Sequence, residues 1–307
     1  MEDSDTVQDA KLLHELIKAK NKDDEKLIKL VTSRTIEERL KIKDEYNSTF
    51  QADLNKDIEK EYSSHFKEVL LALFCPPLDY DCYHIRKAVK GLGTDEDALI
   101  EILSTRTPET IEQMKVRYKE IYPGRDMVAD IKDDTSGSFW KVLSALLQTN
   151  RGDNENPDVE ECTKLAKMLY EAGMTKKNTV EIFTKILTEK SKNEIFTIAK
   201  IYRKIAGSHL LKDLSKFFSG DTKNAFIGIL YGILSPSEYF AKLVNESVKG
   251  LGTKDTTLIR ILVSRYEKDL PNIKQFYKQF YNKDMVEDIK NDTSGSYQRI
   301  LMELCMT

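Results

Sequence analysis

The chain has 307 residues, of which 40% are hydrophobic and 32% charged, and its 48 basic and 51 acidic residues give a formal net charge of -3. This composition is typical of a folded chain with a large core and argues against intrinsic disorder. A near-neutral chain has no bulk attraction for nucleic acid or for an anionic membrane. We therefore expect no nucleic-acid partner, and binding to an anionic surface would need a local patch or a bridging cation.

The amino-terminal segment and the cysteines predict a cytosolic location. Residues 1–5 have neither the basic nor the apolar region of a secretory signal, and no apolar stretch reaches the roughly 20 residues of a membrane-spanning helix. The 4 cysteines are too few for a disulfide scaffold and lack zinc-ligand spacing. We expect free thiols in a reducing compartment.

A repeat dominates the chain. Residues 126–139 return as residues 284–297 with 11 identical positions, and the sequence Val-Lys-Gly-Leu-Gly-Thr occurs at both 89–94 and 248–253. Weaker copies of the same motifs occur between these segments and in the first 75 residues. Self-similarity at a fixed period indicates a repeat architecture, and prolines lie near the expected joints. The sequence thus predicts four units, which are residues 8–76, 79–150, 158–234 and 236–307.

Each unit has the apolar spacing of helices. In the second unit, apolar residues from Leu99 to Val116 recur at helical intervals, and the fourth unit repeats the first part of this set. Residues 235–238, Ser-Pro-Ser-Glu, are typical of a helix start, and Thr94 and Thr253 are expected to be N-caps after glycine turns. No segment alternates as a strand would. The sequence predicts an all-α fold with about five short helices in each unit.

The glycines concentrate in the two strongly repeated units. Six of the 13 glycines lie in their motifs, namely Gly91, Gly93, Gly137, Gly250, Gly252 and Gly295. Because glycine tolerates positive φ, the Lys-Gly-Leu-Gly-Thr loop can turn backbone carbonyls outward as neutral oxygen ligands. Asp134 follows Gly93 by 41 residues, and an aspartate follows Gly252 by 40. A carboxylate folded back onto these carbonyls gives an incomplete all-oxygen set that suits Ca²⁺ better than Mg²⁺.

Helix capping is the alternative explanation for each motif alone. The third unit lacks both motifs, because residues 172–178 form a different loop and Phe217 stands where the carboxylate is expected. The first unit has lost the glycine loop, at residues 19–22, but keeps Glu61. Capping does not require the two motifs to occur together. Their joint presence in two units therefore favours metal binding.

With these motifs the chain resembles the annexins over nearly its whole length, as four annexin repeats. The resemblance implies a compact curved disc with the glycine loops on one convex face. It implies one Ca²⁺ site with carbonyl ligands from Val89, Gly91 and Gly93 and a bidentate Asp134. The corresponding ligands in the fourth unit are Val248, Gly250, Gly252 and Asp292.

The resemblance also implies secondary, weaker metal sites. Secondary calcium sites in such proteins use an acid just after the loop, where Glu96 and Asp255 stand, and Glu61 is a further candidate. Only two units have an intact site. This divergence is similar to that of the alpha-giardins, protist annexin-like proteins of which some associate with the cytoskeleton.

The interpretation is calcium-dependent, reversible binding to acidic phospholipid at the inner face of the plasma membrane. One carboxylate and three carbonyls imply a weak site, at about 10⁻⁴ to 10⁻³ M, which a lipid phosphate would complete. Leu92 and Leu251 at the loop tips either touch the acyl boundary or pack within the loop. Lys90 and Lys249 either contact headgroups or stay solvated. The alternative is a helical scaffold for a cytoskeletal or other protein partner, with calcium secondary.

No catalytic motif is present in the sequence. The 4 histidines form no pattern with a nucleophile, and there is no Gly-x-Ser-x-Gly, His-Glu-x-x-His or phosphate-binding loop of the Walker type. We expect no enzymatic activity, and Ca²⁺ as the only cofactor.

Overall fold

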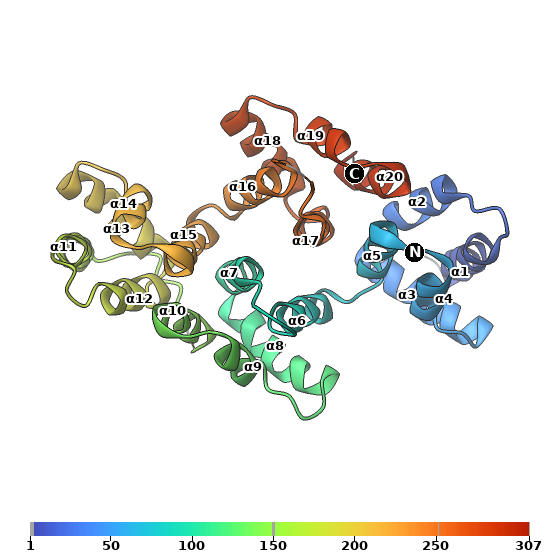
Figure 1. Ribbon diagram of the computed structural model, residues 1–307, viewed down its shortest axis with the longest axis horizontal. Helices are drawn as coiled ribbons and strands as arrows, with labels where there is room; N and C mark the ends of the chain where they lie inside the picture. Colours follow the sequence, from blue (N-terminus) through green and yellow to red (C-terminus); the bar gives the residue numbers. More distant parts are fainter. Residues whose placement is uncertain (1–2, 149–150, 251, 307) are drawn as a thin grey trace. The chain divides into compact units, whose positions relative to one another are not determined.

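The computed structural model describes residues 3–148, 151–250 and 252–306. Across these residues it contains 20 α-helices and no strand (Figure 1). The prediction of an all-α chain with about five short helices per unit is confirmed. No helix in this described part of the chain combines the length and the apolar character needed to cross a bilayer.

Consecutive groups of five helices form repeats 1 to 4. Repeat 1 contains α1 (Asp3–Lys18), α2 (Asp24–Thr32), α3 (Ile36–Phe50), α4 (Leu54–Glu61) and α5 (Ser64–Leu73). Repeat 2 contains α6 (Pro77–Ala88), α7 (Glu96–Thr105), α8 (Pro108–Ile121), α9 (Met127–Asp134) and α10 (Gly137–Gln148). Repeat 3 contains α11 (Val159–Thr175), α12 (Thr179–Glu189), α13 (Lys192–Ala206), α14 (Leu210–Phe217) and α15 (Gly220–Leu234). Repeat 4 contains α16 (Pro236–Val248), α17 (Asp255–Arg265), α18 (Leu270–Tyr281), α19 (Met285–Asp292) and α20 (Gly295–Met306).

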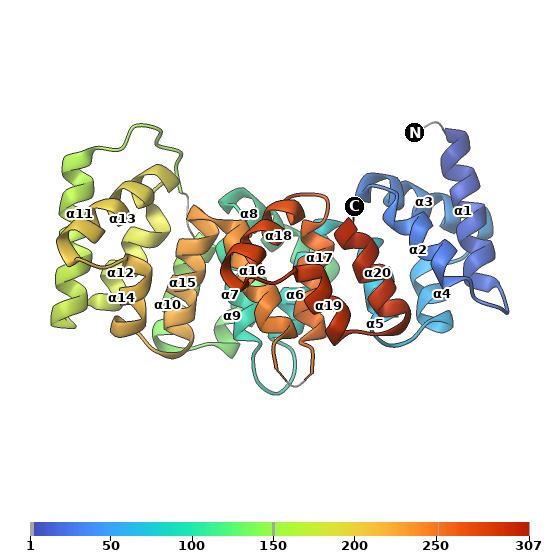
Figure 2. The ribbon, with the colours of Figure 1, turned by 90° about the horizontal axis from the view of Figure 1, so that it is seen from above.

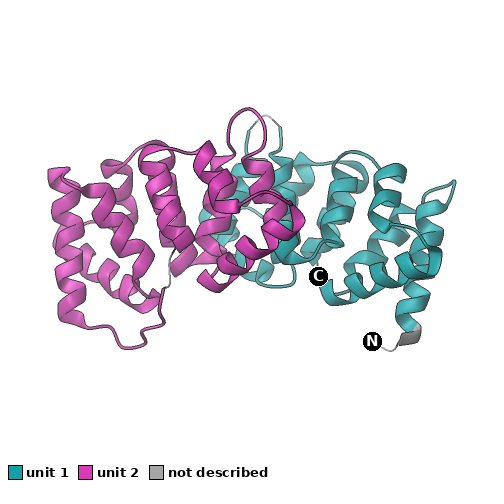
Figure 3. Cartoon of the chain, turned by 90° about the horizontal axis from the view of Figure 1, so that it is seen from below, with its two compact units in different colours: residues 1–80, 240–307 teal, residues 81–239 magenta. Residues whose placement is uncertain are grey.

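The helices pack into two compact units (Figure 3). Unit 1 consists of residues 1–80 and 240–307, and so contains repeat 1 and most of repeat 4, whereas unit 2 consists of residues 81–239. In unit 1, helices α2 and α5 both pack against α20, and α5 also packs against α17. In unit 2, α15 packs against α7 and α10, and α11 packs against α12 and α13. Each unit therefore combines helices from two repeats around its own core.

Two glycines in α15 let this helix approach α7 closely within unit 2. A Cβ atom at Gly232 would lie 2.0 Å from the carbonyl oxygen of Ser104, and one at Gly228 would lie 2.6 Å from Cγ2 of Ile100. Real Cβ atoms do not make contacts this short, because packed interiors leave no room for the overlap. The two glycines that interrupt the apolar run of residues 225–234 therefore serve helix packing.

A tyrosine–aspartate hydrogen bond recurs in all four repeats and joins the third helix of each repeat to the fourth. The distances from the tyrosine hydroxyl to the carboxylate oxygen are 2.7 to 3.0 Å. The pairs are Tyr46–Asp57, Tyr118–Asp130, Tyr202–Asp213 and Tyr277–Asp288. Burial raises the pKa of each tyrosine above its ordinary value, and the neighbouring carboxylate raises it further. These hydroxyls therefore remain hydrogen-bond donors.

Asp213 is the most deeply buried of these four carboxylates, with 3% of its surface exposed. It accepts hydrogen bonds from Tyr202, Ser208 and Lys216. Burial acts to raise the pKa of Asp213. The hydrogen bonds from Lys216, Ser208 and Tyr202 outweigh this effect and hold the pKa below the ordinary value. A folded-state pKa below the unfolded one means that ionised Asp213 stabilises the fold.

We expect Asp213→Asn to lower the free energy of unfolding at pH 7 by about 1.5–3 kcal/mol, the cost of weakening buried hydrogen bonds to a charged group. The stabilisation by ionised Asp213 is complete above the ordinary aspartate pKa of about 3.9 and is lost as the pH falls through the lower folded-state pKa. The difference between wild type and variant should therefore shrink in that acidic window. Urea unfolding of both proteins at pH 7 and below about pH 4 measures it. A difference that stays constant across this range would contradict the assignment.

Candidate metal centre

The glycine loop of repeat 2 connects α6 to α7 and projects beyond the helix ends around it (Figure 2). The backbone N–H of Asp95 donates to the carbonyl of Ala88 at 2.9 Å and closes the loop at its base. Gly91 and Gly93 have φ angles of +117° and +83°, and a Cβ atom at either position would have no neighbour within 4 Å. The backbone conformation, rather than crowding, is thus the reason for glycine at both positions.

The two glycines of the repeat 4 loop, between α16 and α17, have nearly the same φ angles. Gly250 and Gly252 have φ angles of +123° and +84°, and the N–H of Lys254 donates to the carbonyl of Ser247 at 2.8 Å. In repeat 2 the tip residue Leu92 is fully exposed. Leu251, the expected tip in repeat 4, lies outside the described residues.

The distant aspartates lie beside these loops. Asp134 is the last residue of α9, and the hydroxyl of Thr94 donates to its Oδ2 at 2.6 Å and to its carbonyl at 3.0 Å. Asp292 is the last residue of α19, and Thr253 donates to its Oδ2 at 2.5 Å and to its carbonyl at 3.0 Å. Each repeat therefore folds back so that a carboxylate adjoins the glycine loop, as the spacing of the motifs led us to expect.

The expected N-cap role of the two threonines is wrong. Asp95 is the N-cap of α7 and accepts from the N–H of Ala98 at 3.0 Å. Lys254 is the N-cap residue of α17 and makes no side-chain cap bond. The hydroxyls of Thr94 and Thr253 donate instead to the aspartates, and a hydrogen bond to a carboxylate is stronger than one between neutral groups.

The chemistry of the loop and the aspartate fits a calcium ion. In repeat 4, Val248, Gly250 and Asp292 line one open cavity of about 420 Å³ together with Lys249 and Lys283. In the described part of the chain, no three His, Cys, Asp or Glu side chains are grouped so that they could hold a metal. A site here must therefore draw most of its ligands from backbone carbonyls. One carboxylate with neutral carbonyl oxygens is a set that Ca²⁺ accepts, with positions left for outside ligands.

The candidate secondary ligands differ in their surroundings. Glu96 and Asp255 are the first residues of α7 and α17, and both are partly exposed. Asp255 is already engaged within unit 1, since its Oδ2 lies 3.2 Å from Nε2 of His65. It also lies near Tyr297, whose pKa is raised by burial and then by the neighbouring Asp255 carboxylate. Their roles as metal ligands stay predictions.

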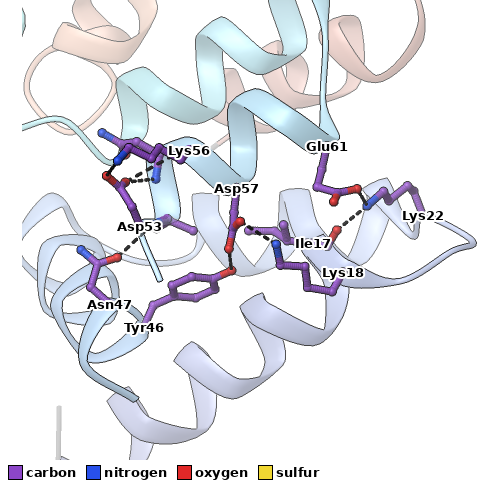
Figure 4. Close-up of polar contacts among 11 residues, drawn as sticks. Ile17, Lys18, Lys22, Tyr46, Asn47, Asp53, Lys56, Asp57 and Glu61 are labelled. Carbon is purple, nitrogen blue, oxygen red and sulfur yellow. Dashed lines mark hydrogen bonds and ion pairs between the residues drawn. The ribbon is translucent and has the colours of Figure 1, made fainter. Parts of the chain in front are cut away.

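In repeats 1 and 3 a lysine side chain reaches the end of the fourth helix, where repeats 2 and 4 have their aspartates. Glu61, the last residue of α4, has Oε2 at 2.9 Å from Nζ of Lys22, and this hydrogen bond lowers the pKa of Glu61 (Figure 4). In repeat 3, Nζ of Lys176 donates to the carbonyl of Phe217, the last residue of α14. Sequence reasoning noted the missing glycines but not these ammonium groups. The signal was present, because Lys22 and Glu61 are separated by 39 residues, as are Thr253 and Asp292.

Comparison with known proteins agrees with this architecture. The family model "Annexin" matches residues 8–73, 80–146, 164–229 and 239–304. Mouse annexin A4 is 37% identical over 300 residues, which cover 97% of this chain and 94% of that protein. Human annexin A7 is 37% identical over 301 residues, which cover 98% of this chain but 62% of that protein. The chain thus spans less than two thirds of the length of annexin A7.

Solved structures with the same fold include annexin III, with a TM-score of 0.94 at 31% identity, over 100% of this chain and 95% of that one. A calcium-bound annexin (Sm)1 has a TM-score of 0.85 at 28% identity, over 98% of this chain and 90% of that one. Calcium-bound alpha-14 giardin has a TM-score of 0.85 at 21% identity, over 98% and 99% of the two chains. The likeness to the giardin shows a shared fold.

Proposed function

The chain belongs to the annexin family, and on this premise we propose that it binds acidic phospholipid membranes reversibly and in a calcium-dependent way. One observation carries the proposal: in repeats 2 and 4, a threonine–aspartate hydrogen bond holds a carboxylate beside a loop whose two glycines have matching φ angles. A second, independent support is the calcium-bound state of the similar annexin (Sm)1 structure.

The proposed ligands in repeat 2 are the carbonyls of Val89, Gly91 and Gly93 and the carboxylate of Asp134. In repeat 4 they are the carbonyls of Val248, Gly250 and Gly252 and the carboxylate of Asp292. Each set supplies about five oxygens, whereas Ca²⁺ takes 6 to 8. A lipid phosphate or carboxylate would complete the shell. Calcium then raises the affinity for lipid, and lipid raises the affinity for calcium by the same factor.

The residues around the repeat 2 loop suit a membrane surface. Leu92 is fully exposed at the tip, and Lys90 beside it is also exposed. Full burial of a leucine in an apolar medium contributes about 1.5–3 kcal/mol, and a lysine near an anionic leaflet adds about 1 kcal/mol. A single loop could therefore add several kcal/mol to binding once calcium has neutralised the carboxylate.

We place the protein at the inner face of the plasma membrane as a reversible peripheral binder, with no catalytic role. The near-neutral net charge of -3 gives no general attraction to an anionic leaflet. The cation must therefore provide the attraction, and removal of calcium should release the protein.

Vesicle co-sedimentation of the full chain tests the proposal. We expect pelleting with phosphatidylserine-containing vesicles at about 1 mM calcium, no pelleting with phosphatidylcholine vesicles, and release by EDTA. Absence of calcium-dependent pelleting would refute the proposal. The loss of the glycine loop in repeats 1 and 3 motivates the alternative of a protein scaffold. Calcium-independent pelleting with microtubules or actin, without vesicle binding, would favour that alternative.

A further inference from the structure

Repeat 1 contains a positive charge of its own at the place where repeats 2 and 4 have their candidate metal centres. The segment between α1 and α2, residues 19–23, has no glycine. Nζ of Lys22 donates to Oε2 of Glu61 at 2.9 Å and also to the backbone carbonyl of Ile17 (Figure 4). One ammonium group thus bridges the end of α1 and the end of α4.

The two groups that Lys22 joins correspond to two of the proposed calcium ligands. Helices α4 and α9 each have 8 residues, and their last residues are Glu61 and Asp134. Ile17 precedes Lys22 by five positions, as Val89 precedes Thr94. The carbonyl of Ile17 and the carboxylate of Glu61 are therefore the counterparts of the Val89 carbonyl and the Asp134 carboxylate.

In repeat 3 a lysine also reaches the end of the fourth helix, but it meets backbone carbonyls and an aromatic ring instead of a carboxylate. Nζ of Lys176 donates to the carbonyls of Lys216 and Phe217 at 3.1 and 3.0 Å. It also lies 5.2 Å from the centroid of the Phe217 ring, a favourable cation–π position. The ring packs on α11 so closely that a Cβ atom at Gly173 would lie 2.2 Å from it. A neutral ring in place of a carboxylate suits a single positive charge better than a divalent ion.

The charge of Lys22 makes this place in repeat 1 unfavourable for calcium. An ammonium group has three donors, and in repeat 1 two of them are directed at protein oxygens. The side chains of Lys22 and Glu61 are only 25% and 26% exposed, so their interaction is partly shielded from water. A divalent cation at this point would meet a like charge at close range and would find its carboxylate already paired.

We propose that Lys22 is a tethered cation that closes repeat 1 in place of calcium, and that Lys176 does the same in repeat 3. Repeat 1 then keeps its loop joined to the end of α4 at any calcium concentration. Each compact unit combines one calcium-dependent repeat with one lysine-closed repeat. The calcium dependence of repeat 4 rests on the proposed function, whereas the closure of repeat 1 by Lys22 does not.

Hydrogen exchange without lipid tests the proposal through backbone amides that flank each loop. The Ala19 amide donates to Glu15 and the Tyr62 amide to Ile58, on the two sides of the Lys22 bridge. In wild type, we expect both to be protected in EDTA and unchanged by calcium. The Lys254 amide, which closes the loop of repeat 4, should gain protection when calcium is added.

Lys22→Met removes the charge and keeps most of the apolar side chain. We expect it to speed exchange at Ala19 and Tyr62 about fivefold in EDTA, the range for a partly exposed ion pair. The exposed Lys20→Met is the matched control and should leave both rates unchanged. Unchanged rates in Lys22→Met, or a need for calcium to protect Ala19 in wild type, would overturn the proposal.

Glu61→Gln tests the Lys22–Glu61 bond from the other partner, because it removes the negative charge. Its effect should be no larger than that of Lys22→Met, which also removes the bond to Ile17, and the double variant should be no worse than Lys22→Met alone, because both changes remove the Lys22–Glu61 bond. Additive effects would show that the two side chains act separately and would contradict the proposal. Fast exchange in Lys22→Met together with failed vesicle binding by wild type would refute the proposed function alone. Unchanged exchange in Lys22→Met together with calcium-dependent vesicle binding by wild type would refute the tethered cation alone.

Discussion

Simultaneous replacement of Asp134 and Asp292 with alanine is expected to abolish calcium-dependent pelleting with phosphatidylserine vesicles. Each aspartate is the one carboxylate in its proposed ligand set, and neutral carbonyls alone do not compensate a divalent charge. Because ligand charge strongly affects calcium affinity, we expect the calcium requirement to rise about 100-fold or more. The fold should persist, since Thr94 and Thr253 still donate to the backbone carbonyls at these positions.

A matched control removes the same charge nearby. Asp133 and Glu287 are exposed residues on α9 and α19, so Asp133→Ala with Glu287→Ala should leave the calcium requirement unchanged. Each single variant, Asp134→Ala or Asp292→Ala, should retain part of the binding, because the other repeat keeps its site. Normal pelleting of the double variant Asp134→Ala/Asp292→Ala would show that these carboxylates are not the ligands.

The second large effect is expected from the loop backbone. Gly91 and Gly250 have φ angles of +117° and +123°, which side chains with a Cβ atom rarely adopt. Because a Cβ atom would have open space at both positions, Gly91→Ala with Gly250→Ala tests conformation alone. Holding alanine in this region costs about 1–3 kcal/mol per loop, so the loop should relax and turn its carbonyls away. We expect a calcium titration of vesicle pelleting to shift by about tenfold or more.

Gly124→Ala separates this effect from general destabilisation. Gly124 lies between α8 and α9, with a φ of +78° and the same open space. Its replacement should lower the melting temperature but leave the calcium midpoint in place. If Gly91→Ala/Gly250→Ala behaved in the same way, the loop carbonyls would not be calcium ligands.

Most of the fold could be predicted from the sequence because it depends on local and repeated patterns. Helical apolar spacing and repeated motifs indicated five helices per unit. The helix start at Pro236 could be read from residues 235–238 and is confirmed. The folding back of Asp134 and Asp292 onto the glycine loops could also be anticipated, because both motifs occur together at the same spacing in two repeats.

The details that were wrong or missed depend on partners far away in the sequence. Thr94 was expected to cap the next helix, but its hydroxyl reaches Asp134, 40 residues later. His65 and Asp255 come from different repeats, and no local pattern indicates that they meet. The bridging ammonium of Lys22 was missed because the first unit was compared for lost glycines only. Alignment of its loop with the other repeats would have placed Lys22 at the position of Thr94.

The assembly of unit 1 from residues 1–80 and 240–307 has a consequence for biosynthesis. Residues 81–239 are continuous, so unit 2 can fold as soon as this stretch has left the ribosome. Helices α2 and α5 must wait for α20, their packing partner in unit 1, while some 200 further residues are translated. During this interval their apolar faces are open to water. The first repeat is therefore open to aggregation for longer than unit 2 during synthesis.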